Sequence, residues 1–288
     1  MKSLISHALL FLFVPLAALS GADDFPGQTI KGFRYPDYDQ QGQLKMEIAG
    51  DQANMLSGGI IKIAGLKMNF YEEGKKVMNV STPLCFYDRV KRTAASTAEV
   101  RITRSEIVIT GRGFDLDEKN THIRINKDSR VILNKSESRA RPDQAAFRSA
   151  PEHDTNNTSI TSVRLTFDQK KATAVFEGNV VVTDPALKIE SDRLTVSFSS
   201  DKKVEAIEAE GNVAITRDAI AANSQKAIYS VGNGKVTLSG NPSVTRGRNR
   251  LSAETIVYWR DSNRILCEPS ARLTVYSEHE LRNRAGRN

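Results

Sequence analysis

The sequence predicts an all-β protein in which long antiparallel strands form a sheet that folds over along its length. Three observations support this fold class. Apolar and polar residues alternate with a period of two over most of the chain, which is typical of strands with one face buried and one in water. Helical periodicity is almost absent. Residues 172–276 contain a recurring unit of about 30 residues, a period typical of stacked architectures whose units bury their apolar faces against one another.

The chain opens with the features of a secretory signal peptide. Lys2 precedes an apolar run from Ala8 to Leu19, and small residues follow up to Ala22. The run is shorter than the roughly 20 residues that a membrane-spanning helix needs. We therefore expect residues 1–22 to be a signal peptide cleaved after Ala22, which places the protein in the periplasm. An uncleaved inner-membrane anchor is the alternative.

The charge balance favours an anionic partner. The signal segment contains one of the 41 basic side chains, so that with 34 acidic ones the remainder has a net charge of +6. The basic residues are scattered singly, without the clustered basic face or the stacking aromatics of nucleic-acid modules. A phosphorylated lipid fits this pattern, and we expect no nucleic acid to bind.

The composition divides the remaining chain into two modules. Residues 135–160 are rich in Ser, Asn, Asp, Pro and Arg, have no apolar period, and form a longer segment than ordinary loops. We read them as a flexible linker between a module at 23–134 and a second module at 161–277. A polar tail, 278–288, follows.

The repeat of the second module is marked by Gly-Asn pairs. Its turn reads FEGNVVVTD from Phe176, AEGNVAITR from Ala209 and LSGNPSVTR from Leu238, and LCEPSARLTV from Leu266 is a degenerate fourth copy. Both residues of the pair tolerate positive φ, so each pair predicts a bulge or bend where a long strand turns a corner. A small residue lies 12 positions after each Asn, at Ser191, Ser224 and Ala253. We expect these to mark the opposite corner of the fold.

The alternation also predicts which side chains of the second module face inward. They are apolar residues on successive strands, which we expect to line an interior between the two layers of the folded sheet: Phe176, Val180, Val182, Ile189, Leu194, Val196, Val213, Ile215, Tyr229, Leu238, Val244, Leu251, Ile256 and Tyr258. Such residues form a core first of all, and alternation by itself does not distinguish a packed core from a ligand site.

These residues resemble a known family, the LptA/OstA-like β-jellyroll proteins of lipopolysaccharide transport. The resemblance covers roughly 162–277 and is carried by the recurring GNV turn and by the small residue followed by Asp192, Gln225 or Glu254. Pro242 and Pro269 depart from the pattern and indicate an irregular C-terminal edge. The first module resembles an LptC-like jellyroll more loosely, through FRYPDYDQQGQLKMEIAGDQANM from Phe33 and IVITGRGFDLD from Ile107.

The resemblance implies two tandem, twisted, V-shaped β-jellyrolls that hold the acyl chains of lipid A between their sheets. It also implies partners: lipopolysaccharide itself, and other transport components of the inner and outer membrane, or further copies of the chain, joined end to end through open sheet edges. Basic residues near the expected corners and rim are candidates for phosphate contacts, although a single exposed Arg more often only keeps a strand soluble: Arg193, Arg217, Lys226, Arg246, Arg248 and Arg250.

We find no signature of catalysis, so the protein is not expected to be an enzyme. The sequence has no GxxxxGK[ST] loop, no GxSxG turn and no complete HExxH, and its histidines are scattered. We predict no catalytic residue, metal or cofactor. The carboxylates of Asp37 and Asp39 read as parts of solvated turns. Cys85 and Cys267 are expected to be two buried thiols, with a single long-range disulfide as the alternative.

Two other functions remain open. A structural or adhesive β-solenoid would bind polysaccharide or protein on its outer face, and its core would admit no fatty acid. A β-helical polysaccharide lyase or hydrolase would need clustered carboxylates or a basic catalytic residue on a concave face, where the repeats carry mostly Thr, Ser and Val.

Overall fold

The computed structural model describes residues 27–133, 157–201 and 203–276, and their strands join in one antiparallel sheet. Two short 3-10 helices, η2 (Ser57–Gly59) and η3 (Val231–Asn233), interrupt it. The strands are β1 (Thr29–Tyr38), β2 (Leu44–Met55), β3 (Ile60–Glu72), β4 (Lys75–Asp88), β5 (Thr93–Arg104), β6 (Ile107–Asp117), β7 (His122–Leu133), β8 (Thr158–Ser162), β9 (Arg164–Asp168), β10 (Thr173–Asp184), β11 (Leu187–Phe198), β12 (Val204–Arg217), β13 (Ile220–Ser230), β14 (Lys235–Ser239), β15 (Ser243–Arg246), β16 (Asn249–Ser252), β17 (Thr255–Trp259), β18 (Arg264–Glu268) and β19 (Arg272–Thr274).

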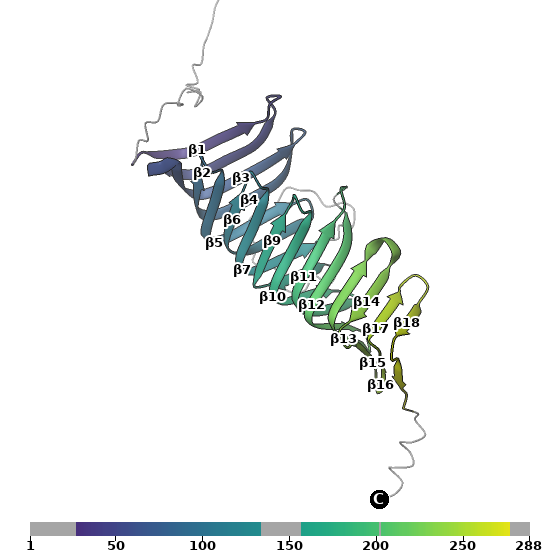
Figure 1. The fold of residues 1–288 in the computed structure, drawn as a ribbon. Helices are drawn as coiled ribbons and strands as arrows, with labels where there is room; N and C mark the ends of the chain where they lie inside the picture. The colour runs from purple at the N-terminus through teal and green to yellow at the C-terminus, as the bar shows by residue number, and fades with distance from the viewer. Residues whose placement is uncertain (1–26, 134–156, 202, 277–288) are drawn as a thin grey trace, which may run out of the picture.

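The sheet is a long meander in which each strand pairs with the next along the chain. β1 and β18 lie at opposite ends of an elongated molecule (Figure 1). Four of the long strands are divided in the middle, so that β8 and β9 together fill one place between β7 and β10. β14 with β15, β16 with β17, and β18 with β19 fill single places in the same way. The expected irregular C-terminal edge is thus observed.

A line of bulges crosses the middle of the sheet from β4 onward. Gly178 and Asn179 together oppose the single residue Asp192, because the register between β10 and β11 shifts there. The same shift occurs between β12 and β13 beside Gly211 and Asn212. All these residues except Asp192 have positive φ, as do Gly240 and Asn241, which confirms the conformation predicted from the Gly-Asn pairs. We call this line of bulges the crease.

The small residues 12 positions later lie on this same crease and not at an opposite corner, so that prediction was wrong. Ser191 pairs directly with Val180, next to Gly178 and Asn179, and Ser224 pairs with Val213. Because neighbouring strands run antiparallel, the chain that leaves the crease at Asn179 passes through the hairpin turn and meets the crease again at Ser191. The spacing of 12 is the length of chain out from the crease and back.

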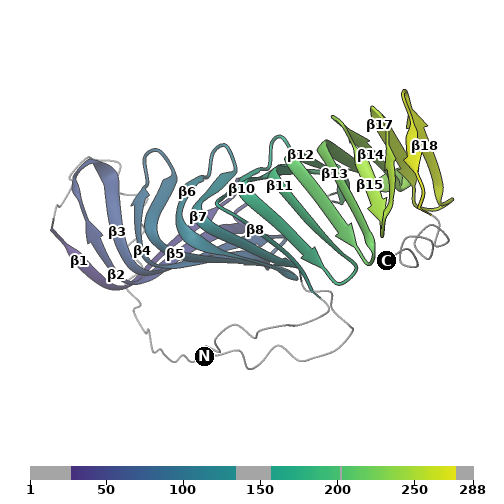
Figure 2. The same ribbon diagram turned by 90° about the horizontal axis from the view of Figure 1, so that it is seen from below.

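The crease divides the sheet into two arms. Arm A contains β9, β14, β17, β18 and the halves of the other strands that pair with them; arm B contains β8, β15, β16, β19 and the corresponding halves. The hairpin turns at the far end of each arm form its lip. Figure 2 shows the bent strands following one another along the whole length of the molecule.

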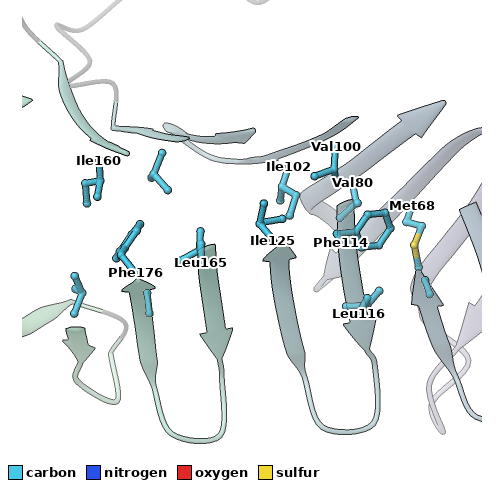
Figure 3. Packing of buried hydrophobic residues seen from close by; sticks show 14 of the residues in the cluster. Met68, Val80, Val100, Ile102, Phe114, Leu116, Ile125, Ile160, Leu165 and Phe176 are labelled. Carbon is cyan, nitrogen blue, oxygen red and sulfur yellow. The ribbon is translucent and has the colours of Figure 1, made fainter. Parts of the chain in front are cut away.

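One hydrophobic core lies between the arms and extends through both halves of the chain. Figure 3 shows Ile102 of arm B and Ile125 of arm A pointing toward one another, and Ile160 of arm B lying opposite Phe176 of arm A. These residues belong to a single cluster that runs from Phe33 to Ile256. The sheet is also unbroken, because β7 pairs with β8 and β9.

The all-β antiparallel fold, with long strands folded over an apolar interior, is therefore confirmed. The predicted strand segments at Phe33 and Ile107 are β1 with β2, and β6. The signal peptide, most of the expected linker and the polar tail lie outside the described residues. Residues 158–160 of that linker belong to β8. Within the described residues, no helix is long and apolar enough to cross a membrane.

The crease predicts an unequal tolerance of glycine substitution. At Gly211 a Cβ atom would lie 2.3 Å from Asp192 Oδ2, and φ is +75°. Gly211→Ala should therefore lower the free energy of unfolding by about 1–3 kcal/mol through backbone strain and displacement of Asp192. Gly232→Ala is the matched control, since a Cβ there meets nothing within 4 Å. Urea unfolding followed by circular dichroism measures both, and equal stabilities would contradict the role of the crease.

Candidate functional site

The inward-facing residues predicted for the second half line the space between the arms, which we call the seam. Phe176, Val180, Leu194, Val196, Val213, Leu238 and Ile256 are buried in the core cluster, and Val182, Ile189, Ile215, Val244 and Leu251 are partly buried against it. Tyr229 and Tyr258 are half-buried, and the Tyr258 hydroxyl donates a hydrogen bond to Asn263 Oδ1 at 2.9 Å.

Burial within the seam falls off with distance from the crease. Val180, Leu194 and Val213 beside the crease are each 1% exposed. Ile189 and Ile215, which pair with each other farther out on arm B, are only partly buried. The seam is thus closed by its own side chains at the crease and keeps apolar surface accessible toward the lips. An apolar guest would enter from the lips.

The predicted lining left out part of the seam. Ala174, Ala209 and Ala227 are buried on arm A, at inward positions of β10, β12 and β13. Phe167 and Phe198 also pack there, with ring centroids 6.4 Å apart in an edge-to-face arrangement. Alanine is a weak apolar signal. The alternation that the alanines share with Phe176 and Leu194 could have identified them, since inward residues on paired strands lie opposite each other.

Buried hydroxyl groups follow the crease beside the seam. Ser191 donates a hydrogen bond to the carbonyl oxygen of Arg193 at 3.0 Å, and Ser162 donates to that of Arg164 at 2.8 Å. Ser129 and Ser162 are joined at 2.7 Å across the two halves of the chain. A hydroxyl at the bend satisfies a carbonyl that the bulge removes from the ladder, which is why small polar residues stand there.

Two of the six predicted phosphate contacts lie beside the crease. Arg193 and Lys226 are on the outer face of the sheet there, because they alternate with the buried Leu194 and Ala227. Arg193 Nη1 lies 3.0 Å from Glu177 Oε1. The ammonium of Lys226 lies 2.5 Å from Glu208 and 3.2 Å from Glu210, and its hydrogen bond to Glu208 raises the pKa of Lys226.

The other four basic residues gather at the lip of arm B. Ile220 pairs with Arg217 on one side and with Arg246 on the other, and all three share the inward register of Ile215 and Val244. Arg248 lies in the turn after Arg246, and Arg250 is the second residue of β16, where it pairs with Thr245 on the outer face; the four are exposed. Among the described residues we find an ion pair only for Arg217, with Asp218 at 3.9 Å.

The two cysteines are free thiols. Cys85 is fully buried on arm A, and burial raises its pKa to about 12, whereas Cys267 is half-buried in β18. The described residues contain no group of three His, Cys, Asp or Glu side chains suited to hold a metal ion. His153 and His279 lie outside the described residues.

Two comparisons with known proteins give a match. Residues 159–264 match the family model described as LptA/(LptD N-terminal domain) LPS transport protein. Among solved structures the chain is similar to LptH from Pseudomonas aeruginosa, described as the LptA homologous periplasmic component of the conserved lipopolysaccharide transport device. That match has 18% identity and a TM-score of 0.39, and covers 42% of this chain and 96% of LptH. A search of curated proteins finds no match.

The crease serines give a prediction with opposite signs. Ser224 is 6% exposed, and its hydroxyl finds no hydrogen-bond partner within the described residues. Ser224→Ala should leave stability unchanged or raise it by up to about 1 kcal/mol, because a buried hydroxyl without a partner is costly. Ser191→Ala should lower stability by about 0.5–1.5 kcal/mol, since it removes the bond to the Arg193 carbonyl. Urea unfolding of the two variants tests this, and a larger loss at Ser224 would contradict it.

Proposed function

We infer that this protein carries lipopolysaccharide across the periplasm. The match of residues 159–264 to the LptA/(LptD N-terminal domain) family of lipopolysaccharide-transport proteins supports this inference. The lipid A acyl chains lie in the seam between the arms, while the saccharide and its phosphates remain outside. The protein acts as part of the bridge between the inner and outer membranes. Its function is transport and not catalysis.

The graded burial of the seam is the observation that supports this proposal. Residues beside the crease pack tightly, whereas Val182, Ile189, Ile215 and Val244 nearer the lips keep part of their apolar surface accessible. Each methylene moved from water onto such a surface contributes about 0.8 kcal/mol. Several acyl chains held along the seam are therefore much more stable there than in the water of the periplasm. The seam follows the meander and provides a continuous path for them.

The lip of arm B supplies the charge for the headgroup. Arg217 and Arg246 stand at the outer end of the inward register that holds Ile215 and Val244, so a lipid with its chains in the seam would place its phosphates near them. Arg248, in the turn after Arg246, extends the positive lip, whereas Arg250 pairs with Thr245 and faces outward. Guanidinium groups bind phosphate through charge-assisted, often bidentate hydrogen bonds. We do not extend this role to Arg193 and Lys226, which carboxylates already bind on the outer face.

The two ends of the sheet suit end-to-end assembly. β18 and β19 form the last edge, where Ile265 and Leu273 are 55% and 66% exposed. An edge strand offers unpaired backbone groups to a further strand. We propose that other bridge components, or a second copy of the chain, extend the sheet there. Residues 1–22 would direct export to the periplasm, and the energy for transport would come from another protein.

The seam predicts position-specific contact with lipid. A photoreactive residue at Ile215 should form an adduct with lipopolysaccharide, because that side chain faces the seam, whereas the same residue at the neighbouring, outward-facing Thr216 should not. Mass spectrometry of the irradiated complex measures both. Adducts at neither position, in a folded protein, would favour an adhesive solenoid that binds polysaccharide or protein on its outer face.

The positive lip predicts a loss of affinity that depends on lipid phosphate. The double variant Arg217→Gln and Arg246→Gln should weaken binding of lipopolysaccharide about tenfold or more, since each charge-assisted bond contributes about 1.5–3 kcal/mol. Arg193→Gln on the outer face is the matched control and should bind normally. Titration with chemically dephosphorylated lipid should abolish the difference, and an equal loss with both lipids would contradict phosphate contact.

A further inference from the structure

The two arms are joined by charged side chains across their lips in the first half of the chain. Arg92 Nη2 donates a hydrogen bond to Asp37 Oδ2 at 2.5 Å and another to Glu118 Oε1, while its Nε donates to Glu118 Oε2 at 3.1 Å. Lys45 Nζ lies 3.7 Å from Glu118 Oε1. We call these four residues the clasp. Asp37 was expected to lie in a solvated turn. That prediction was wrong, because Asp37 lies in β1 and binds Arg92.

The strand register places the members of the clasp on different arms. Asp37 pairs with Met46, and Met46 pairs with Phe70, all in arm B, and Lys45 lies beside Met46. Arg92 lies in the turn between β4 and β5, and Glu118 follows β6; both turns belong to the lip of arm A. Arg92 with Asp37 and Lys45 with Glu118 are thus contacts across the mouth, whereas Arg92 with Glu118 is a contact within arm A.

The clasp is more than an exposed surface ion pair. The Glu118 side chain is 7% exposed, that of Asp37 21% and that of Arg92 34%. The hydrogen bond with the Glu118 carboxylate raises the pKa of Arg92 above its ordinary value. In the second half, by comparison, the ion pairs of Glu177 with Arg164 and Arg193, and of Lys226 with Glu208, each lie within arm A.

An apolar hollow lies close to the clasp. It is lined by Phe33 and Tyr35 of β1, Met55, Ile61, Tyr87 and Arg89, so that five of its six walls are hydrophobic or aromatic. Its space of about 20 Å³ is the room that one water molecule needs. Clasp and hollow are neighbours, since Tyr35 of the hollow and Asp37 of the clasp lie on the same face of β1, and Arg89 and Arg92 lie in the same turn.

We propose that the hollow is the end of a second acyl-chain site in the first half of the chain, and that the clasp gates it. Closed, the hollow takes no more than a methyl-sized group. Parting of the arms would break the two contacts across the mouth and leave Arg92 paired with Glu118, so the opened state buries no unpaired charge. The occupant is an acyl chain, because Phe33, Ile61 and Tyr87 give the hollow an apolar lining and belong to the same continuous core as the seam. The inference rests on the proposed function and deepens it.

The native Cys85 reports opening of this site. It lies two residues before Tyr87 on β4, with both side chains buried in the core, and it is 0% exposed. The test uses full-length mature protein carrying Cys267→Ser, and measures the rate at which N-ethylmaleimide modifies Cys85. The double variant Asp37→Asn and Lys45→Gln removes only the contacts across the mouth. It should raise this rate at least tenfold.

A matched control makes the same chemical changes within one hairpin. Asp201→Asn and Lys203→Gln remove a 3.0 Å ion pair of the turn between β11 and β12, and should leave the Cys85 rate unchanged. The rate is also measured at rising urea concentration. A weak dependence indicates parting of the arms, whereas a steep one indicates global unfolding and would overturn the gate, as would equal rates in the two double variants.

A lipid probe then tests the occupant independently of the second half. A palmitic acid analogue with a diazirine at its methyl end should label the peptide containing Tyr87 more strongly in the clasp variant than in the control. Opening of Cys85 without such labelling would overturn the acyl site. Labelling at Tyr87 together with no lipopolysaccharide adduct at Ile215 would instead contradict the proposed transport function and leave the gated site standing.

Discussion

The crease is the constraint on which the rest of the structure depends. A strand that must bend sharply and then resume pairing needs an extra residue on one side, and that residue needs positive φ. Gly211 and Asn212 meet this need while Asp192 occupies the space that a side chain at Gly211 would fill, and Asn212 Nδ2 donates to Asp192 Oδ2 at 2.9 Å. Because the bulges of successive strands lie at the same level, the bends align and the sheet becomes two arms.

The same alignment explains why the seam is closed at one side and accessible at the other. Beside the crease the arms are close, so Val180, Leu194 and Val213 bury one another and leave no room for a guest. Farther out the arms carry side chains of the same size on surfaces that diverge, and Ile189 and Ile215 stay partly exposed. An apolar site next to water thus results from the geometry of the two arms.

Sequence patterns predicted the elements of the fold because the period of two and the Gly-Asn pairs are local properties. Inward residues such as Phe176 and Val213 followed from alternation, whereas the buried Ala227 was not among the predicted lining residues, because its small side chain gives little signal. The position of Ser191 was misjudged, since whether two bends lie at one corner or two depends on register between strands. The contact of Asp37 with Arg92 was not predicted, because it joins residues far apart in sequence.

The two halves share one core but differ in how their arms are held. In the first half the lips are joined by Asp37, Arg92, Glu118 and Lys45, whereas in the second half the lip of arm B carries exposed arginines with one weak ion pair among those described. The ion pairs that join the lips of the first half resist separation of the arms, whereas the arginines of the second half lie on one arm and attract an anion to its lip. A phosphorylated lipid would therefore enter the second half more easily than the first. The apolar interior continues from the second half into the first, where the clasp holds the arms together. The same sheet would thus hold lipid at one end and control its passage at the other.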